Sequence, residues 1–448
     1  MMHFLYDTAL TLFLIFSFPY FFLRSLFEKP LRNELAQRFG CLPPLPPHPI
    51  WVHAASVGEV LCSIPLIKRI REEWSGCKIV VTTMTRTGNI TARKQIPEAD
   101  EVLFLPWDHP VILEGFFNKM DPAFLLIAET ELWPNLLRSC GKKKVPAVLF
   151  NGRISDKSFP RYRRLLSLFG RPLEVISLFL MQTEKDRQRI VEIGARPERT
   201  KVTGNIKFDQ PFPELTEETK TRMATSLGLR GHERILIAGS THPGEEEMLL
   251  DVYRGLLEVT PELIFILCPR HLDRLEQVES VLEKGKMPWV RRTALSAENP
   301  LLRGGVMDIP PVVLLDTMGE LMKLYSLGTL VFIGGSLVPV GGHNPLEPLW
   351  FGKCVFFGPH MFNFLEITRL LIEASGAIQV KDRADLLFQA RRLLQEEGTR
   401  KEIGERGYRV LQSHRGSTER ILGEIRPILK EIEDRRLYLP AGEAGIGD

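Results

Sequence analysis

Two glutamates in the first half of the chain each follow a short apolar run. The run 50–53 gives way to small residues and then to Glu59, and the run 124–127 gives way to Glu129. Because the carboxyl ends of parallel strands meet at one edge of a sheet, we expect both carboxylates in one crevice. The surroundings of a shared site can give two carboxylates different pKa values, so that one acts as a base and the other stabilises charge in the transition state. Each glutamate taken alone could equally be a helix-start carboxylate that complements the helix dipole.

A lysine closes the first half of the chain. Lys207 lies in the string GNIKFD, directly after the last expected strand of that half. A cation at this point can neutralise an anionic leaving group or the carboxylate of a substrate. The alternative is a lysine in a solvated loop.

The second half contains glycine-bearing breaks after successive expected strands. Glycine and serine at a strand-to-helix turn let backbone N–H groups reach phosphate oxygens, and Arg270 can grip an anion with two hydrogen bonds. Glu347 can accept hydrogen bonds from ribose hydroxyls. Each break alone is a weak signal, but together they predict a nucleotide site; they lie at 238–245, 268–271, 317–320 and 334–348.

Several common classes of site and protein are not indicated. The strings GxGxxG, GxxxxGK[ST], GxSxG and HExxH are missing from the sequence. His242, His271 and His343 lie in turns without a complete set of metal ligands, so we expect hydrogen-bonding loop residues and no metal site. The six cysteines form no CxxC pair, which indicates reduced thiols. A net charge of only +3 argues against a dedicated nucleic-acid binder.

The elements that would hold these residues alternate along the chain. Apolar strand-like runs are followed by longer amphipathic runs, which is typical of βα units on a parallel sheet and predicts an α/β protein. With 448 residues the chain exceeds the size of most single cores, so we expect two domains. The charge-rich stretch 209–233, with prolines at 211 and 213, is the expected hinge.

The N-terminus is a separate apolar segment. The sixteen residues Thr8–Leu23 carry no charge, and cations follow at Arg24, Lys29 and Arg32. At about 1.5 Å per residue they cover roughly 24 Å, which is marginal for a membrane span. The cations on the C-terminal side predict a membrane anchor with the bulk of the protein in the cytoplasm. The alternative is an apolar helix docked on the protein itself, and whether an anchor spans or lies in the bilayer stays open.

A second segment, 158–171, mixes arginines with apolar residues. Beside an anchor this composition suits a surface against lipid or around a phosphorylated lipid head group. A partly buried amphipathic helix with solvated arginines explains it equally well.

These motifs together resemble one known family. In order they are WVHAASVGE, AETELWP, GNIKFD, AGSTHPGEEE, CPRH, DTMGEL and GGHNPLEP, behind an apolar N-terminus. They are similar to those of the 3-deoxy-D-manno-octulosonic acid (Kdo) transferases of Gram-negative bacteria, over roughly residues 1–425. The resemblance implies a GT-B glycosyltransferase with two facing Rossmann-like domains of parallel sheets. It implies inverting transfer of Kdo from CMP-Kdo to the lipid A precursor lipid IVA, at the cytoplasmic face of the bacterial inner membrane during lipopolysaccharide assembly.

The resemblance also assigns roles to residues. Glu59 matches the proposed general base, and Glu129 and Lys207 match positions of transition-state stabilisation. No cofactor and no metal are implied; the expected partners are CMP-Kdo, lipid IVA and membrane lipid, and no nucleic acid. The segments that match the CMP site contain Pro269, Arg270, Met318, Gly319, Glu320, Asn344, Pro345, Leu346 and Glu347.

The expected organisation follows from the motifs and the composition. Other readings are a different GT-B transferase or an epimerase of a nucleotide sugar, and a membrane-tethered binding protein without catalysis. The number of Kdo units added and the oligomeric state are not legible in the sequence. The boundaries are an anchor at 1–28, an acceptor-binding domain at 29–210, a hinge at 211–233, a CMP-Kdo-binding domain at 234–430 and a loose tail at 431–448.

Overall fold

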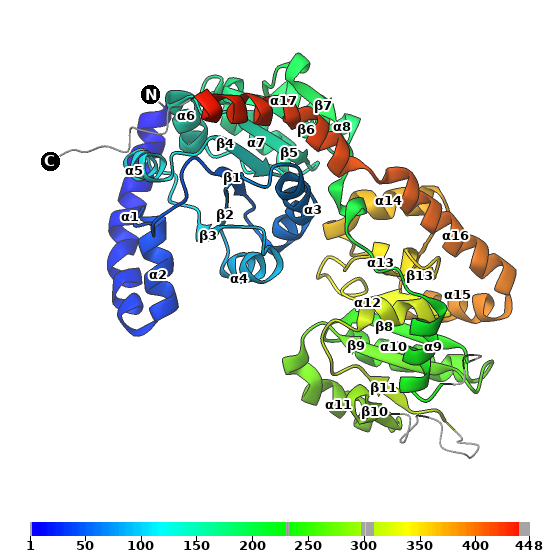
Figure 1. The fold of residues 1–448 in the computed structure, drawn as a ribbon. Coiled ribbons are helices and arrows are strands. Elements are labelled where there is room, and N and C mark those ends of the chain that lie inside the picture. The colour runs from blue at the N-terminus through cyan, green and yellow to red at the C-terminus, as the bar shows by residue number, and fades with distance from the viewer. Residues whose placement is uncertain (1, 230, 232, 297–300, 302–308, 439–448) are drawn as a thin grey trace. The chain divides into compact units, whose positions relative to one another are not determined.

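The chain divides into two compact units. The computed structural model describes residues 2–229, 231, 233–296, 301 and 309–438 (Figure 1). The first unit contains the chain up to Gln210 and again from His414 onwards, and the second contains Pro211–Ser413. Each unit is built around a parallel sheet.

In its described residues the first unit has one seven-stranded sheet in the order β3-β2-β1-β4-β5-β6-β7. Apolar and β-branched residues fill its central strands, which are buried on both faces, as a parallel sheet between helical layers requires. The strand order reverses between β1 and β4, and such a switch point leaves a crevice at the carboxyl ends of the strands. The strands are β1 (Ile50–His53), β2 (Ile79–Thr83), β3 (Glu101–Phe104), β4 (Phe124–Ala128), β5 (Ala147–Gly152), β6 (Ile176–Met181) and β7 (Thr200–Val202).

Helices cover both faces of this sheet. One face packs against α3 (Val57–Glu73), α4 (Arg86–Gln95) and α17 (Ser417–Tyr438). The other face packs mainly against α5 (Pro110–Met120) and α6 (Pro134–Lys143). The unit also contains α7 (Ser158–Leu168), α8 (Glu184–Ile193) and the short 3-10 turn η3 (Ile206–Asp209).

The C-terminal helix corrects the expected domain limits. We expected the second domain to run to residue 430 and a loose tail from 431, but α17 belongs to the first unit and stays helical to Tyr438. Its buried side chains at Ile421, Leu422, Ile425 and Leu429 join the core of the first sheet. An apolar stripe at this spacing needs a hydrophobic partner, and the first sheet supplies it. The rest of the expected tail, 439–448, lies outside the described residues.

The second unit repeats the architecture. Its described residues form a seven-stranded sheet in the order β10-β11-β9-β8-β12-β13-β14, with the reversal between β8 and β12. The strand pairs are parallel here too, so the α/β fold with two Rossmann-like domains is confirmed. The strands are β8 (Ile235–Thr241), β9 (Ile264–Pro269), β10 (Trp289–Arg291), β11 (Val312–Leu314), β12 (Leu330–Ile333), β13 (Cys354–Phe357) and β14 (Ile378–Gln379).

The expected hinge at 211–233 contains a helix and belongs to the second unit. Helix α9 (Glu217–Ser226) begins at Thr216, whose hydroxyl accepts a hydrogen bond from the amide of Thr219. A threonine cap of this kind starts a helix in a charge-rich stretch that composition alone makes look like a linker. The other helices of the unit are α10 (Glu245–Leu257), α11 (Leu275–Lys284), α12 (Leu321–Leu324), α13 (Leu346–Leu349), α14 (Leu365–Glu373), α15 (Arg383–Gln395) and α16 (Glu397–His414), the last of which ends at the boundary.

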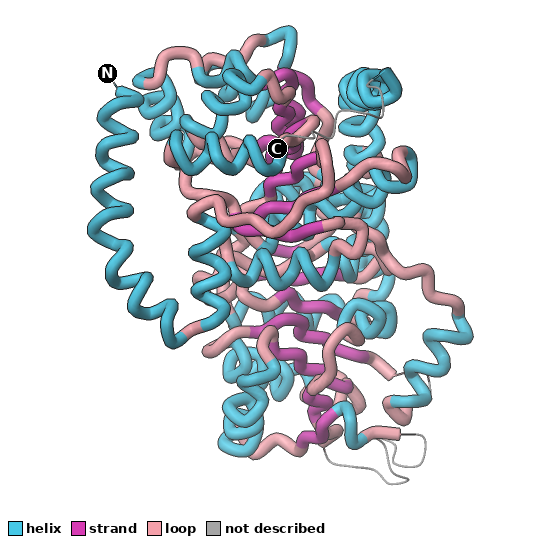
Figure 2. The backbone as a smooth tube through the Cα atoms, turned by 60° about the vertical axis from the view of Figure 1, so that its left-hand side comes forward, coloured by secondary structure: helices cyan, strands magenta, loops and turns pink. Residues whose placement is uncertain are grey.

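The apolar N-terminus forms one long helix, α1 (Met2–Phe27). Helix α2 (Lys29–Arg38) turns back beside it, and the two lie side by side in both views (Figures 1 and 2). Among the described residues, α1 is the one helix long and apolar enough to cross a membrane.

Candidate functional site

Glu59 lies at the switch point of the first sheet, in the first turn of α3 after β1. Its side chain is only 8% exposed. One carboxylate oxygen accepts a hydrogen bond from the amide of Ala55 at 2.7 Å, and the other accepts one from the hydroxyl of Ser56 at 2.9 Å. The carboxylate is therefore held at the helix N-terminus, where its orientation is fixed from two sides.

The surroundings of Glu59 suit a base. Burial, the largest cause, and the charges of Glu129 and Glu131 together raise its pKa to about 7, although the bonds from Ala55 and Ser56 lower it. A carboxylate whose pKa lies near neutral pH is matched to proton transfer, because the ionised form is present and the protonated form is accessible. Burial also raises the pKa of Glu131, whose carboxylate accepts a hydrogen bond from the indole of Trp133 at 2.8 Å.

Glu129 and Lys207 lie near each other at the same edge of the sheet. The ammonium of Lys207 is 3.9 Å from a carboxylate oxygen of Glu129. Burial raises the pKa of the Cys62 thiol to about 12, and Lys207, Glu129 and Glu59 all act electrostatically on this one thiol. The three predicted residues of the first unit therefore lie close enough together to act electrostatically on the same thiol.

The backbone at Glu129 is strained. Its φ of +55° is in the left-handed region, which a residue with a Cβ rarely adopts. The amide of Glu129 is tied to the carbonyl of Phe150 at 3.0 Å, and the hydroxyl of Tyr162 in α7 donates to the carbonyl of Thr130 at 2.9 Å. Strain that neighbouring bonds over-determine is common at functional sites, where it fixes a side chain.

Asn151 supports Lys207 and was not singled out from the sequence. It is the penultimate residue of β5, its backbone is in the left-handed region with φ +53°, and its side chain is fully buried. Its amide oxygen accepts a hydrogen bond from the backbone of Ile206 at 3.1 Å, while its carbonyl accepts one from the side chain of Gln182 at 3.0 Å. The turn that carries Lys207 is thus fastened to the end of β5. An asparagine before a glycine at a strand end is the signal that could have identified it.

Glu245 organises the switch point of the second sheet. It is completely buried at the start of α10 and accepts four main-chain hydrogen bonds. The donors are the amide of His242, in its own loop, and those of Gly335, Ser336 and Leu337 after β12, at 2.6 to 3.0 Å. One carboxylate therefore joins the two loops that flank the switch point. The run of glutamates in HPGEEE did not reveal that Glu245 and Glu246 are buried while Glu247 is exposed.

Histidines from the same two loops meet beside Glu245. The Nε2 atoms of His242 and His343 are 2.8 Å apart, so one ring donates and the other accepts. Burial and the positive charge of Arg270 lower the pKa of His343 to about 3. Burial also lowers the pKa of His242, so both rings are neutral hydrogen-bonding groups at neutral pH, which is the role expected for them. Among the described residues no three side chains of His, Cys, Asp or Glu are grouped to hold a metal ion.

Some of the predicted CMP-site residues are brought together. Burial raises the pKa of Glu347 to about 7; a hydrogen bond from Asn344, at 3.4 Å, and the charge of Arg270 lower it. Pro269 ends β9, and the amide of Arg270 donates to the carbonyl of Thr241 at 3.0 Å. Pro345 and Leu346 are buried at the start of α13.

The remaining predicted segment has its own contacts. Glu320 pairs with Arg292 at 3.3 Å and accepts a hydrogen bond from Thr317. Met318 is 74% exposed, and Gly319 has a φ of +84°, which a residue other than glycine would adopt only with strain. This segment follows β11, which is adjacent to β9, so it reaches the same carboxyl edge as Arg270.

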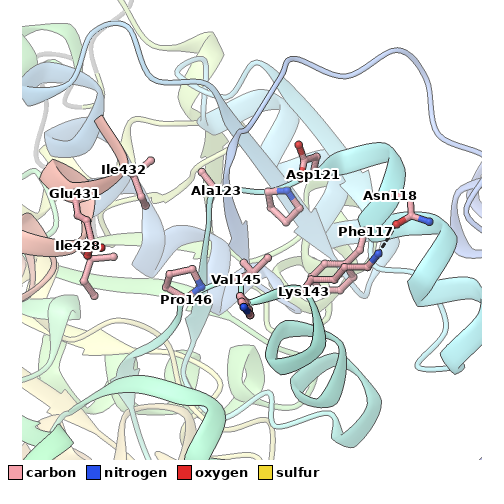
Figure 3. A pocket seen from close by; sticks show the side chains of 12 residues that line it. Phe117, Asn118, Asp121, Ala123, Lys143, Val145, Pro146, Ile428, Glu431 and Ile432 are labelled. Carbon is pink, nitrogen blue, oxygen red and sulfur yellow. Dashed lines mark hydrogen bonds between the residues drawn. The ribbon is translucent and has the colours of Figure 1, made fainter. Parts of the chain in front are cut away.

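A cavity of about 470 Å³ lies at the other edge of the first sheet. Ala123 and Pro146 directly precede β4 and β5, so this cavity is at the amino ends of the strands, opposite Glu59 and Glu129 (Figure 3). Ile428 and Ile432 of α17 form one wall, and on another Lys143 donates a hydrogen bond to Asn118 at 2.6 Å (Figure 3). None of the predicted site residues lines it.

Comparison with known proteins is consistent with this geometry. A family model described as 3-deoxy-D-manno-octulosonic-acid transferase (kdotransferase) matches residues 33–210. The chain is 36% identical over 404 residues to a 3-deoxy-D-manno-octulosonic acid transferase of Haemophilus influenzae, covering 89% of this chain and 92% of that protein.

Solved structures at lower identity share the fold. A glycosyltransferase of Rickettsia africae superposes with a TM-score of 0.56 at 12% identity, covering 86% of this chain and 99% of that one. A putative UDP-N-acetylglucosamine 2-epimerase of Listeria monocytogenes superposes with a TM-score of 0.51 at 15% identity, covering 87% and 98%. Because a transferase and an epimerase share this fold, the fold alone does not separate the two activities.

Proposed function

The chain belongs to the family of 3-deoxy-D-manno-octulosonic acid (Kdo) transferases, and we propose that it transfers Kdo from CMP-Kdo to the lipid A precursor lipid IVA in lipopolysaccharide assembly. It is a glycosyltransferase enzyme by this membership. The observation that carries the proposed mechanism is the buried Glu59 carboxylate. Its pKa of about 7 means that it can both accept and release a proton at neutral pH.

In the proposed reaction Glu59 accepts the proton of the acceptor hydroxyl. The hydroxyl oxygen attacks the anomeric carbon of Kdo, the bond from that carbon to the phosphate oxygen breaks, and CMP leaves with the bonding electrons. A single displacement of this kind inverts the anomeric centre. A general base typically contributes about 10²–10⁴-fold to such a step.

Glu129 and Lys207 are proposed to balance charge during the displacement. Departure of CMP develops positive charge on the sugar ring, next to the carboxylate that Kdo itself carries. Glu129 can stabilise that positive charge, and Lys207 can neutralise the phosphate or the sugar carboxylate. Their 3.9 Å separation keeps each charged group compensated before substrate arrives.

The second unit is proposed to bind the cytidine nucleotide. Arg270 offers a bidentate donor for phosphate, and the glycine-rich loop after β12 presents backbone N–H groups. Asn344 and Glu347 are proposed to hydrogen-bond the ribose. The segment Met318–Glu320 is proposed to complete the nucleotide pocket, with Pro269, Pro345 and Leu346 setting its shape.

The proposed location is the cytoplasmic face of the bacterial inner membrane, where lipid IVA is embedded. Helix α1 supplies the apolar surface for attachment; Arg24 lies in its last turn, and Lys29 and Arg32 follow in α2. Basic side chains beside an apolar helix favour the anionic cytoplasmic leaflet.

The direct test incubates the purified full chain with CMP-Kdo and lipid IVA and weighs the lipid products by mass spectrometry. The expected result is a mass increase of one or more Kdo residues, which also counts the units added. Consumption of CMP-Kdo without any lipid product, or conversion of a nucleotide sugar in the absence of acceptor, would contradict the proposal and favour the epimerase alternative.

A further inference from the structure

Helix α1 has its polar side toward the protein and its apolar side outward. The partly covered positions recur every three or four residues along its whole length, so they form one face. Apart from four apolar residues this face is polar; it contains Met2, His3, Tyr6, Asp7, Leu10, Thr11, Leu14, Ser17, Phe21 and Ser25. A surface helix of a water-soluble domain shows the reverse pattern, with its apolar side on the core.

The outward side is a continuous apolar stripe. Its central residues are spaced by seven and four, so they fall on one line along the helix; they are Leu5, Leu12, Phe16, Leu23 and Phe27, with exposed fractions of 51, 48, 80, 59 and 88%. A continuous exposed apolar stripe along a whole helix is typical of a surface that binds a partner or a membrane.

The N-terminal half of α1 is fixed to the first unit by hydrogen bonds, which we call the polar clamp. Tyr6 donates to the carboxylate of Asp108 at 3.0 Å, and Thr11 shares a hydrogen bond with the ring of His109 at 3.1 Å. Asp7 accepts a hydrogen bond from the side chain of Asn135 at 2.6 Å and pairs with Arg138 at 3.5 Å.

The clamp is anchored in the fold of the unit. Asp108 is buried and also accepts the backbone amides of Asn135 and Leu136 at 3.0 and 2.7 Å, so it caps the N-terminus of α6. Displacing α1 from this position would leave buried polar groups without partners, and each such group costs about 1–3 kcal/mol.

Charged elements therefore accompany α1 along its length. Asp108 and Arg138 lie beside its N-terminal half, and α2 with Lys29 and Arg32 turns back beside the rest. If α1 crossed the bilayer, these neighbours would lie at the same depth in the hydrocarbon. A charged side chain at the bilayer centre costs roughly 2.5–3.5 kcal/mol or more.

We propose that α1 lies along the membrane surface, with its polar face clamped to the first unit and its apolar stripe in the lipid, and does not cross the bilayer. This inference rests on the proposed membrane attachment and specifies its geometry. The occupant of the stripe is the lipid surface, since apolar side chains face outward along the whole helix while cations follow directly in α2. The arrangement is that of a monotopic amphipathic helix buried about 5–10 Å into the interface.

The first measurement separates attachment from geometry. The full chain is mixed with vesicles of phosphatidylethanolamine and phosphatidylglycerol and floated on a density gradient. Flotation supports the proposed attachment, and Phe16→Asp with Leu23→Asp should reduce it strongly because both charges enter the stripe. Failure of the wild-type chain to float would overturn the membrane part of the proposed function, and this inference with it.

The second measurement tests the geometry. Single cysteines replace each of the five stripe residues in a Cys41→Ser background, carry a spin label, and report depth through their accessibility to oxygen and to a nickel chelate. An in-plane helix gives five similar shallow depths. A spanning helix, about 39 Å long from its 26 residues, gives a deep value at Phe16 and shallow ones at Leu5 and Phe27, and that result would overturn the proposal.

The third measurement tests the clamp. A label at Ser17, on the docked face, is compared in Asp7→Ala and in Asp7→Asn, which keeps an oxygen for the side chain of Asn135. Asp7→Ala should increase the mobility of the label while flotation is unchanged, and Asp7→Asn should lie closer to the wild type. Equal, unchanged mobility in both variants would show that the polar clamp does not hold the helix.

Discussion

Replacing Glu59 by glutamine should weaken catalysis and stabilise the fold at the same time. The pKa of this carboxyl rises from 4.5 to about 7 in the folded chain. At about 1.4 kcal/mol for each pH unit, the difference amounts to roughly 3 kcal/mol against the ionised form. The folded state holds the proton up to pH 7 while the unfolded state releases it near pH 4.5, so the chain loses stability as the pH rises across this interval.

The variant Glu59→Gln removes the charge and keeps the shape. Its amide oxygen can still accept from Ala55 and its amide nitrogen can donate to the hydroxyl of Ser56. We expect a melting temperature above that of the wild type at pH 8 and close to it at pH 5, while Kdo transfer falls about 10²–10⁴-fold. Glu72→Gln is the matched control, because Glu72 is an exposed glutamate of the same helix.

The pH dependence of kcat/KM in the wild-type chain should show the same pKa of Glu59. Because the base must be ionised, kcat/KM should rise with pH and reach half its plateau near pH 7, with about a tenth of the plateau at pH 6. Removing a neighbouring charge by Glu131→Gln should move the midpoint to lower pH, but not to 4.5, because burial is the larger cause. Near wild-type turnover in Glu59→Gln, or a stability gain that is the same at pH 5 and pH 8, would refute the reasoning.

Three further outcomes can be measured. Asn151→Gly keeps the backbone angle but removes the amide that holds the turn of Lys207, so kcat should fall about fivefold or more with little change in KM. Glu245→Gln leaves some of the four main-chain donors without an acceptor and should weaken CMP binding about tenfold or more in calorimetric titration, whereas the exposed Glu247→Gln should not. In Gly239→Ala the new methyl group would clash with the buried hydroxyl of Tyr325. The free energy of unfolding should therefore fall by about 1–3 kcal/mol, which a lower melting temperature would report.

Much of the first-unit site follows from the order of strands and loops. Glu129 directly follows β4, and Glu59 lies in the first helical turn after β1. Parallel pairing of these two strands puts both positions at one edge of the sheet. The contribution of Glu131 did not follow, because a second glutamate two residues on has no pattern of its own. Glu131 raises the pKa of Glu59 electrostatically, and no sequence pattern predicts that effect.

The polar supports were missed for a related reason. Glu245 and Asn151 hydrogen-bond with backbone groups roughly ninety and fifty residues away in the chain. Backbone donors carry no sequence signature, so these long-range bonds could not be predicted, although Asn151 precedes a glycine at a strand end. The edge strands β10 and β14 are runs of three and two residues, which are too brief to show a periodic pattern in the sequence.

The predicted domain limits were wrong at two places, where composition does not indicate which sheet a helix packs against. Charged residues around α9 suggested a linker, although a threonine cap starts a helix there. The polar stretch at the C-terminus suggested a tail of the second domain, although Ile421 and Ile425 supply an apolar stripe to the first. Which sheet a stripe covers is a long-range property, and helix periodicity predicts only that some surface must be covered.

The return of α17 to the first sheet has a consequence for how the protein is made. When the ribosome has synthesised residues 1–210, every strand of that sheet is present together with α3 and α4. Helix α17, which completes the cover of the same face, begins more than two hundred residues later. Part of the core of the nascent first unit therefore stays exposed to water until the second unit and then α17 have been synthesised. A fragment ending at residue 210 should show the same exposed core permanently, which makes it a poor substitute for the full chain.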